Sequence, residues 1–600
     1  MQVVKSYNPL LLSVLLIGCT PLHAQGVPNS AVSKYDNSYE IFQPVVSSHG
    51  MVATEQRLAS QVGADILKQG GNATDAAVAI GFTLAVVLPN AGNLGGGGFM
   101  LVHDAKATQT EAIDFRETAP SAASRDMYLD ASGKVIAGKS TITRFAVGVP
   151  GTVAGLTYAL EKHGSMPIAR VVAPAIQLAE EGFIVSPVLA EQFKLQRDHL
   201  GRWPGSRGVF FKAKSTHQAC QPDACDLNQV EPLQAGDRLK QPDLAKTLGL
   251  IADKGAAAFY QGDIAQKIVT EVNQDGNVMS LDDLAHYQIQ SRQPVRGSYR
   301  GVDVLSMPAP SSGGIHLIEM LNLLEYFQLS ESGFGSAQSI HLLTEAARLA
   351  YADRSEYLGD PAFYKVPQIG LTSKGYAQSL IKKINPNKAT ASKDTKPGLP
   401  LPYESDQTTH FSVMDKNGNV VSTTYTLNLN FGSGMVARGT GVLLNNEMDD
   451  FSVKPGVPNA FGLVGGQANA IEAGKRPLSS MTPVIAFKNG KPWIATGSPG
   501  GSRIITTVLQ NLVNVIDYQM NIAEAAAMPR MHHQWVPDVL RLERGFSPDT
   551  IKILKGMGHD VKVQPTMGRI QTVQFENGMY WGSSDPRNPD GAAIGVEVQQ

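Results

Sequence analysis

A hairpin pattern in the last third of the chain restricts the fold more than any other feature. His410–Met414 alternates polar and apolar residues, as a half-buried strand does. Lys416-Asn417-Gly418 is a turn signal, and Val420–Leu427 is rich in the β-branched residues that strands favour. These features predict two antiparallel strands joined by a short loop.

The loop length decides which residues of the hairpin face each other. A three-residue loop, with Gly418 in the left-handed conformation, places Asp415 opposite Asn419 and Thr408 opposite Thr426. A two-residue loop would shift the register by one residue and turn Thr426 to the other face. The sequence leaves both registers open.

Helical and strand patterns come in blocks along the chain. Residues 56–88 read as two helices, Arg57–Leu67 and Ala73–Val87, which are separated by the Gly70-Gly71-Asn72 break. Other helical patterns cover residues 166–181, 242–275, 316–350 and 504–515, and strand patterns cover Val442–Leu444, Val484–Phe487 and Trp493–Thr496. Blocks without strict alternation favour a layered α+β fold over a doubly wound parallel sheet.

Two segments between these blocks have an unusual composition. Four glycines, residues 95–98, lead into an apolar strand. A phosphate loop would have the order strand, glycines, helix, with a following Gly-Lys-Ser/Thr, so close backbone packing beside a site is favoured instead. Residues 387–406 are polar and rich in Lys, Pro and Ser, which predicts a flexible, exposed tether before Thr408.

Composition and charge exclude several classes of protein. Of 600 residues, 42% are hydrophobic and 17% are charged, as in a globular protein with a buried core. The net charge is −2 without a basic stripe, so nucleic acid is not an expected partner.

The N-terminus has the form of a secretory signal peptide, which we expect over residues 1–24. Lys5 precedes the apolar run Pro9–Gly18, and this run is shorter than the ~20 residues that cross a bilayer. Cleavage near Ala24 would give a free periplasmic protein. Leu16–Cys19 also matches a bacterial lipobox, in which Cys19 would carry a lipid anchor. No transmembrane span is expected.

Cys220 and Cys225 are the other two cysteines of the chain. A pair in an exported chain is consistent with a disulfide that closes a small loop, and two free thiols are the alternative. A zinc site on them is disfavoured because four ligands are not available nearby.

The stretch around Thr408 closely resembles the signature of gamma-glutamyltransferases (glutathione hydrolases), bacterial type. Its matching segments are Thr408–Val413, Gly418–Val420, Thr424–Asn428 and Phe431–Gly432. Further blocks occur in family order at Asp114–Pro120, Pro310–Gly314, Tyr351–Arg354, Asn445–Phe451, Arg476–Met481 and Gly497–Ser502. The resemblance runs from about residue 40 to the C-terminus.

The resemblance implies a four-layer αββα sandwich of the N-terminal-nucleophile hydrolase type. Autocatalytic cleavage between Gln407 and Thr408 would give a large subunit, residues 25–407, and a small subunit, residues 408–600, which form a heterodimer. No metal or organic cofactor is implied.

The chemistry of a new N-terminal threonine is consistent with this resemblance. A hydroxyl is a poor nucleophile without a base. Once Thr408 is N-terminal, its own α-amine, with a reference pKa near ~8, lies beside Oγ and accepts the proton. In the precursor the same Oγ would attack the Gln407 carbonyl. The resemblance implies that Thr426 orients the amine.

The resemblance also implies the remaining roles in the site. Gly500 and Gly501 would form the oxyanion hole. The γ-glutamyl zwitterion would be bound through its carboxylate by Arg116, Ser479 and Ser480, and through its ammonium by Asn428, Glu447 and Asp450. Glutathione would be the donor, with water, an amino acid or a dipeptide as acceptor.

Two further segments carry expectations. Lys454–Pro477 resembles a lid loop, with Phe461 where a tyrosine is common, so a missing phenol hydroxyl would loosen lid closure. His532 and His533 are adjacent on one strand and point to opposite faces, which predicts structural roles and no shared metal ion. We assign His410 no proton-transfer role.

Two alternatives stay open, and only the second belongs to another functional class. A cephalosporin (glutaryl) acylase would share the fold and the nucleophile, but its substrate lacks the ammonium that Asp450 would bind. A non-catalytic exported binding protein would keep the fold without cleavage.

Overall fold

The structure is a computed structural model that describes residues 41–215, 226–400 and 410–597. The expected signal peptide, Cys19, the pair Cys220 and Cys225, and the cleavage site Gln407–Thr408 lie outside the described residues. The helices and strands of the described part belong to one compact unit, Phe42–Gln600.

The described residues form two seven-stranded sheets, and every pair of neighbouring strands within them is antiparallel. The first sheet has the order β1 (Val45–Ser47), β22 (Met579–Ser584), β21 (Gln571–Glu576), β17 (Lys491–Gly497), β16 (Val484–Lys488), β11 (Val302–Ser306), β10 (Val295–Tyr299). The second has the order β23 (Ala592–Gly595), β2 (Gly50–Thr54), β12 (Phe411–Asp415), β13 (Val420–Thr426), β3 (Gly97–Asp104), β4 (Gln109–Phe115), β9 (Gln290–Arg292).

The two sheets pack face to face, and the alternation of side chains along each strand explains how. In β2, Met51 and Ala53 belong to an apolar cluster shared with strands of the first sheet, whereas Val52 between them belongs to the cluster with the helices. Successive residues of a strand point to opposite faces. A sheet buried on both faces therefore needs apolar residues on both, and all five residues of β2 are buried.

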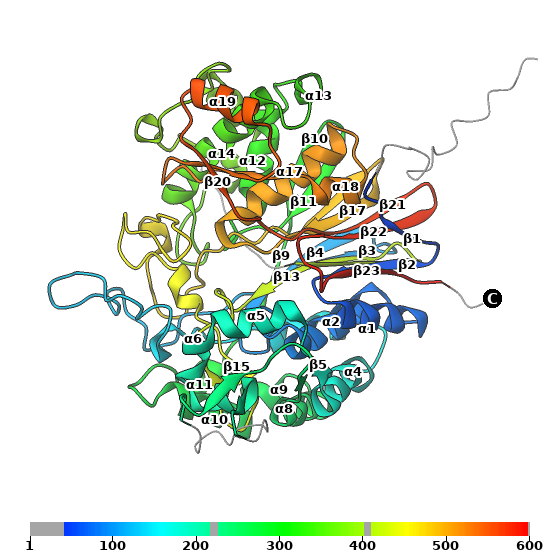
Figure 1. The fold of residues 1–600 in the computed structure, drawn as a ribbon, viewed down its shortest axis with the longest axis vertical. Helices are drawn as coiled ribbons and strands as arrows, with labels where there is room; N and C mark the ends of the chain where they lie inside the picture. The colour runs from blue at the N-terminus through cyan, green and yellow to red at the C-terminus, as the bar shows by residue number, and fades with distance from the viewer. Residues whose placement is uncertain (1–40, 216–225, 401–409, 598–600) are drawn as a thin grey trace, which may run out of the picture. The chain divides into compact units, whose positions relative to one another are not determined.

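Helices cover the outer face of each sheet, which gives four layers in the order α, β, β, α (Figure 1). The second sheet is covered by α1 (Arg57–Lys68), α2 (Ala73–Val87) and α3 (Thr152–His163), with α4 (Ile168–Glu181) packed behind them on α2 and α8 (Pro242–Lys254) packed on α4. The first sheet is covered by α12 (Gly313–Leu324), α17 (Ile504–Ile516) and α18 (Ile522–Ala527), with α14 (Ala337–Tyr357) packed on α12. The α+β class and the αββα sandwich are both confirmed.

The break between α1 and α2 lies where the sequence predicts it. Asn72 caps α2, because its side chain accepts hydrogen bonds from the backbone N–H groups of Thr74 and Asp75, each at 2.9 Å. The Asp75 carboxylate accepts the Asn72 N–H at 2.8 Å in return. This capping box satisfies backbone donors that a helix start leaves without partners. All residues of α2 are buried, so it is a central helix of its layer.

The hairpin β12–β13 has the three-residue-loop register. Phe411 pairs with Thr423, and the Asp415 N–H donates to the Asn419 carbonyl at 3.1 Å. Gly418 has φ +86°, the left-handed conformation that the loop requires. At the open end, His410 Nδ1 lies 3.2 Å from Thr424 Oγ1, in the same register.

The predicted exposure of the tether holds for only part of its described residues, 387–400: Lys393 and Leu399 are exposed, whereas other positions are anchored in the fold. The Trp535 indole N–H donates to the carbonyls of Ser392 and Thr395 at 3.0 and 3.1 Å. The Gly398 N–H donates to Asp353 Oδ1 at 2.6 Å. Ser392 and Thr395 are buried. Polar composition indicated exposure, but distant side chains satisfy these polar groups inside the fold.

No helix within the described ranges is long and apolar enough to cross a membrane.

Candidate active site

A cavity of about 240 Å³ opens where the ends of several strands meet. Strand β13 of the second sheet ends beside it, and β17 of the first sheet leads into its glycine turn. Eight of the residues singled out in the sequence line this cavity: Thr426, Asn428, Glu447, Asp450, Ser479, Ser480, Gly500 and Gly501. Segments far apart in the chain therefore bring the expected groups together. Arg116 is not among the lining residues.

Thr426 is the last residue of β13, and the chain turns sharply after it. The Thr426 hydroxyl accepts the Asn428 N–H at 2.8 Å. Asn428 has φ +77° and donates from its amide nitrogen to the Asn446 carbonyl at 2.9 Å. Its amide oxygen is buried without a hydrogen-bond partner among the described residues. The turn thus presents a free acceptor beside the cavity.

Gly500 and Gly501 form the turn between β17 and α17. Their φ values are +137° and +57°, in a region that side-chain-bearing residues rarely adopt. A Cβ at Gly501 would lie 2.3 Å from Cδ1 of Phe461, whereas one at Gly500 would have no neighbour closer than 3.6 Å. Glycine is therefore required at 501 by conformation and by space, and at 500 by conformation.

A cluster of buried charges lies next to the cavity. Arg116 has no exposed surface, and it donates to Glu447, to Asp450 Oδ2 at 2.7 Å and to the Pro477 carbonyl at 3.2 Å. Burial alone would lower the pKa of Arg116, but the carboxylate of Glu447 and its acidic neighbours outweigh burial and raise it. Burial raises the pKa of Glu447 well above its ordinary value. Arg116 therefore orients two acids that line the cavity.

Glu117 was not singled out, yet it completes this cluster. Its carboxylate lies 3.6 Å from Arg116 and is fully buried. Neither carboxylate oxygen has a hydrogen-bond partner among the described residues. Burial raises the pKa of Glu117 to about 7. The only sequence feature that could have indicated Glu117 as a site residue is its position next to Arg116 in a family block.

Arg354 is a second arginine that sequence reasoning did not assign to the site. It lies on α14 and donates to Ser312 Oγ at 2.9 Å and to Ser480 Oγ at 3.4 Å. Its Nη2 is 3.5 Å from the Ser479 carbonyl. Burial lowers the pKa of Arg354 to about 10, which leaves it charged at neutral pH. It fixes the two serines that line the cavity.

The loop Lys454–Pro477 reaches the cavity through Phe461, whose ring packs against Gly501. The Gln534 amide donates to the carbonyl of Gly462 at 3.0 Å, and Asn459 Nδ2 donates to Asp450 Oδ1 at 3.1 Å. Ring packing and these hydrogen bonds hold the loop over the site without a phenol hydroxyl.

Three histidines, His410, His532 and His533, have hydrogen-bond partners inside the fold. His410 is buried, and its Nε2 lies 2.5 Å from Ser412 Oγ. Burial lowers its pKa well below the ordinary range, so the ring is neutral. His532 Nδ1 lies 2.8 Å from Thr506 Oγ1, and His533 Nε2 lies 3.1 Å from Asp538 Oδ1. His532 and His533 have different partners, but only His532 lies on a strand, because β18 (Met531–His532) ends there, so the prediction of two histidines on one strand is wrong.

Comparisons with known proteins agree with this arrangement. The family model for gamma-glutamyltranspeptidase matches residues 59–595. The glutathione hydrolase proenzyme of Escherichia coli (strain K12) is 51% identical over 586 residues, which cover 97% of this chain and 98% of that protein. The acylase ACY 1 proenzyme of Pseudomonas sp. (strain V22) is 38% identical over 564 residues, which cover 92% of each chain.

The solved structure of a cephalosporin acylase from Bacillus halodurans superposes with a TM-score of 0.81 at 27% identity, covering 94% of this chain and 100% of that one. The fold is thus shared with acylases, whereas the full-length family match and the higher identity lie with glutathione hydrolases. The chain belongs to the gamma-glutamyltranspeptidase family.

Proposed function

We propose that this enzyme transfers γ-glutamyl groups from glutathione and other γ-glutamyl amides to water or to amino acids and dipeptides. The observation that carries the proposal is the cavity at the end of β13, where Thr426, a glycine turn and Asp450 meet. Strand β12, which follows the proposed nucleophile in the chain, pairs with β13 beside this cavity.

The nucleophile in this proposal is Thr408, freed by autocatalytic cleavage. Its Oγ attacks the Gln407 carbonyl, the C–N bond breaks as the acyl group moves to oxygen, and water hydrolyses the resulting ester. The new α-amine then serves as the base that accepts the Oγ proton during each turnover. The described pairing of β12 and β13 has the register of the three-residue loop, and a strand continued in that register would bring residue 408 opposite Thr426, which supports a role for Thr426 in orienting this amine.

Oxyanion stabilisation is assigned to the turn at Gly500 and Gly501. When Thr408 Oγ attacks the γ-carbonyl, negative charge develops on the carbonyl oxygen and needs donors already aimed at it. Successive backbone N–H groups in a turn of positive φ can converge on one anion. Collapse of the intermediate expels the amine of the donor and leaves the acyl-Thr408 ester.

Recognition of the γ-glutamyl zwitterion is assigned to two sets of residues that line the same cavity. The ammonium would be bound by Asp450, by Glu447 and by the free amide oxygen of Asn428. The carboxylate would be bound by the hydroxyls of Ser479 and Ser480, which Arg354 supports from behind.

Arg116 was expected to bind the carboxylate directly. In this structure three of its donors are engaged by Glu447, Asp450 and Pro477. The guanidinium has five N–H donors in all, so a direct contact with substrate stays a proposal.

A cephalosporin acylase is the alternative function, and substrate preference distinguishes it from a γ-glutamyltransferase. A glutaryl side chain carries no α-ammonium, so the acidic groups at the cavity would face it without a partner, which is costly for a buried charge. We expect faster hydrolysis of γ-glutamyl-p-nitroanilide than of glutaryl-cephalosporin. The reverse order would favour the acylase.

Cleavage is tested by denaturing gel electrophoresis and intact mass. We expect two chains that meet between Gln407 and Thr408, and loss of both cleavage and activity in Thr408→Ala. A single uncut wild-type band near 64.1 kDa would favour a non-catalytic binding protein. Normal cleavage in Thr408→Ala would contradict the mechanism.

We also propose export to the periplasm, because of the leader-like N-terminus. The mass of the large chain would locate its N-terminus and distinguish cleavage near Ala24 from lipidation at Cys19. An oxidised Cys220–Cys225 pair would lower that mass by about two units.

A further inference from the structure

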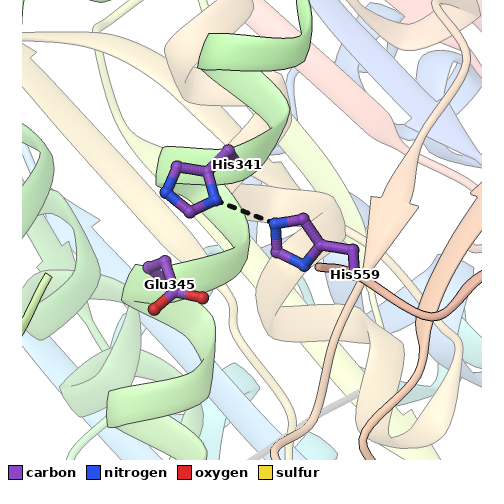
Figure 2. A group of neighbouring side chains, drawn as sticks. All are labelled: His341, Glu345 and His559. Carbon is purple, nitrogen blue, oxygen red and sulfur yellow. Dashed lines mark hydrogen bonds between the residues drawn. The ribbon is translucent and has the colours of Figure 1, made fainter. Parts of the chain in front are cut away.

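Three buried side chains outside the proposed active site converge on one point. His341 and Glu345 lie one turn apart on α14, and His559 lies in the loop between α19 (Pro548–Gly556) and β20 (Val561–Gln564). Figure 2 shows the two imidazoles facing each other with the carboxylate beside them. One ligand atom from each lies within 4.8 Å of the others. None of the three lines the cavity described above.

The contacts of His341 fix which of its nitrogens is protonated. Its Nε2 lies 2.7 Å from the Asn385 carbonyl oxygen, which can only accept. Nε2 therefore carries the hydrogen, and Nδ1 holds a lone pair. This Nδ1 lies 2.8 Å from Nε2 of His559. A histidine that donates one ring N–H to a backbone carbonyl and presents the other nitrogen is the usual arrangement of a metal ligand.

The other two groups have unused bonding capacity. The Nδ1 of His559 has no hydrogen-bond partner among the described residues, so the ring hydrogen can move to it and free Nε2, the nitrogen beside His341. The Glu345 oxygens accept only long hydrogen bonds, from Arg348 Nε at 3.2 Å and from the Thr390 N–H at 3.3 Å. Both oxygens therefore have lone pairs left for a further ligand.

We propose that His341, Glu345 and His559 bind one divalent transition metal, with zinc as its probe. Two imidazole nitrogens and one carboxylate oxygen are a ligand set that zinc takes, with a water in the fourth position. With metal–nitrogen bonds of about 2.1 Å in a tetrahedral site, the two imidazole nitrogens, now 2.8 Å apart, need to separate by roughly 0.6 Å, and the carboxylate, within 4.8 Å of them, needs to come to about 3.4 Å.

The proton balance of binding is simple. His559 moves its ring hydrogen from Nε2 to Nδ1, so its Nε2 lone pair faces the metal and no proton is released.

The position of this metal site gives it a structural consequence. His341 and Glu345 precede residue 407, and His559 follows it. A bound metal would join the two chains that cleavage produces. This consequence rests on the proposed cleavage, whereas metal binding itself does not.

Metal content of the full-length protein tests the proposal. Protein purified from a culture supplemented with zinc is measured by inductively coupled plasma mass spectrometry, and its affinity is measured by competition with a chromophoric chelator. We expect about one zinc per chain in the wild type, and at least about tenfold weaker binding in His559→Gln and in Glu345→Gln. His286→Gln, at an exposed histidine outside the cluster, is the matched control and should bind as the wild type does.

Circular dichroism identifies any variant that fails to fold, and either of the two variants suffices for the test. Wild-type protein without stoichiometric zinc, or folded variants that bind zinc as tightly as the wild type, would overturn the proposal. The thermal midpoint should fall when the metal is chelated in the wild type and stay unchanged in the variants. If the wild-type chain stays uncut and still binds zinc, the proposed cleavage is wrong and the proposed metal site is supported.

Discussion

Asp450 offers the sharpest test of the proposed substrate class. Its side chain is 10% exposed; Oδ2 accepts from Arg116 at 2.7 Å and Oδ1 accepts from Asn459 at 3.1 Å. In Asp450→Asn, the amide oxygen can still accept from Arg116, and Glu447 still neutralises the guanidinium. The substitution therefore removes negative charge from the cavity with little change in shape.

The ammonium contact is lost only for the γ-glutamyl substrate, whereas the hydrogen bond from Asn459, which an amide NH2 cannot accept, is lost with either substrate. A hydrogen bond between an ammonium and a carboxylate contributes about 1.5–3 kcal/mol. Its loss should lower kcat/KM for γ-glutamyl-p-nitroanilide by about 10- to 150-fold. Glutaryl-p-nitroanilide has the same chain without the ammonium, so its slower hydrolysis should change little or improve.

Measuring kcat/KM of Asp450→Asn on both substrates distinguishes loss of the ammonium contact from a general disturbance of the active site. Equal losses on both would show that Asp450 supports the site without contacting the ammonium, and would refute the reasoning. Unchanged kcat/KM on the γ-glutamyl substrate would remove Asp450 from the site.

Two further substitutions test the site and the core. Gly501→Ala should lower kcat by about 100-fold, because its Cβ would lie 2.3 Å from the Phe461 ring and the oxyanion turn must shift; hydrolysis of γ-glutamyl-p-nitroanilide measures it, and unchanged kcat would contradict the assignment. Burial raises the pKa of Glu319 to about 8 from 4.5, so the folded state retains a proton that the unfolded chain has lost, and stability falls as pH rises through this window. Between pH 6.5 and 8, the free energy of unfolding should decrease by roughly 1–2 kcal/mol less in Glu319→Gln than in the wild type. Urea unfolding at both pH values measures the slope, and identical slopes in wild type and variant would exclude this origin.

Local patterns were sufficient for the elements around the site. The division between α1 and α2 follows from two glycines and the Asn72 cap, whose interactions lie within four residues of each other. The β12–β13 hairpin follows from alternation and one turn glycine, Gly418. The register was the exception, because both loop lengths were compatible with the sequence and only the observed pairing decides between them.

Family blocks named eight residues that line one cavity, but they did not place the charges. Arg116 was expected to face the substrate, and in the structure it lies buried between two acids that line the cavity. Arg354 lies within a block that had no assigned role, yet it supports Ser480. Motifs record which residues occur together, whereas direction and burial depend on the packing around them.

The sequence by itself determined the fold class, the family and the candidate nucleophile, because these follow from local periodicity and from ordered motifs. Only the tertiary structure decided that the segment before residue 400 is anchored by Trp535 and Asp353. It also decided that His341 meets His559, 218 positions along the chain. The physical reason is that such contacts depend on how distant segments pack, and neither residue carries a local signal of its partner.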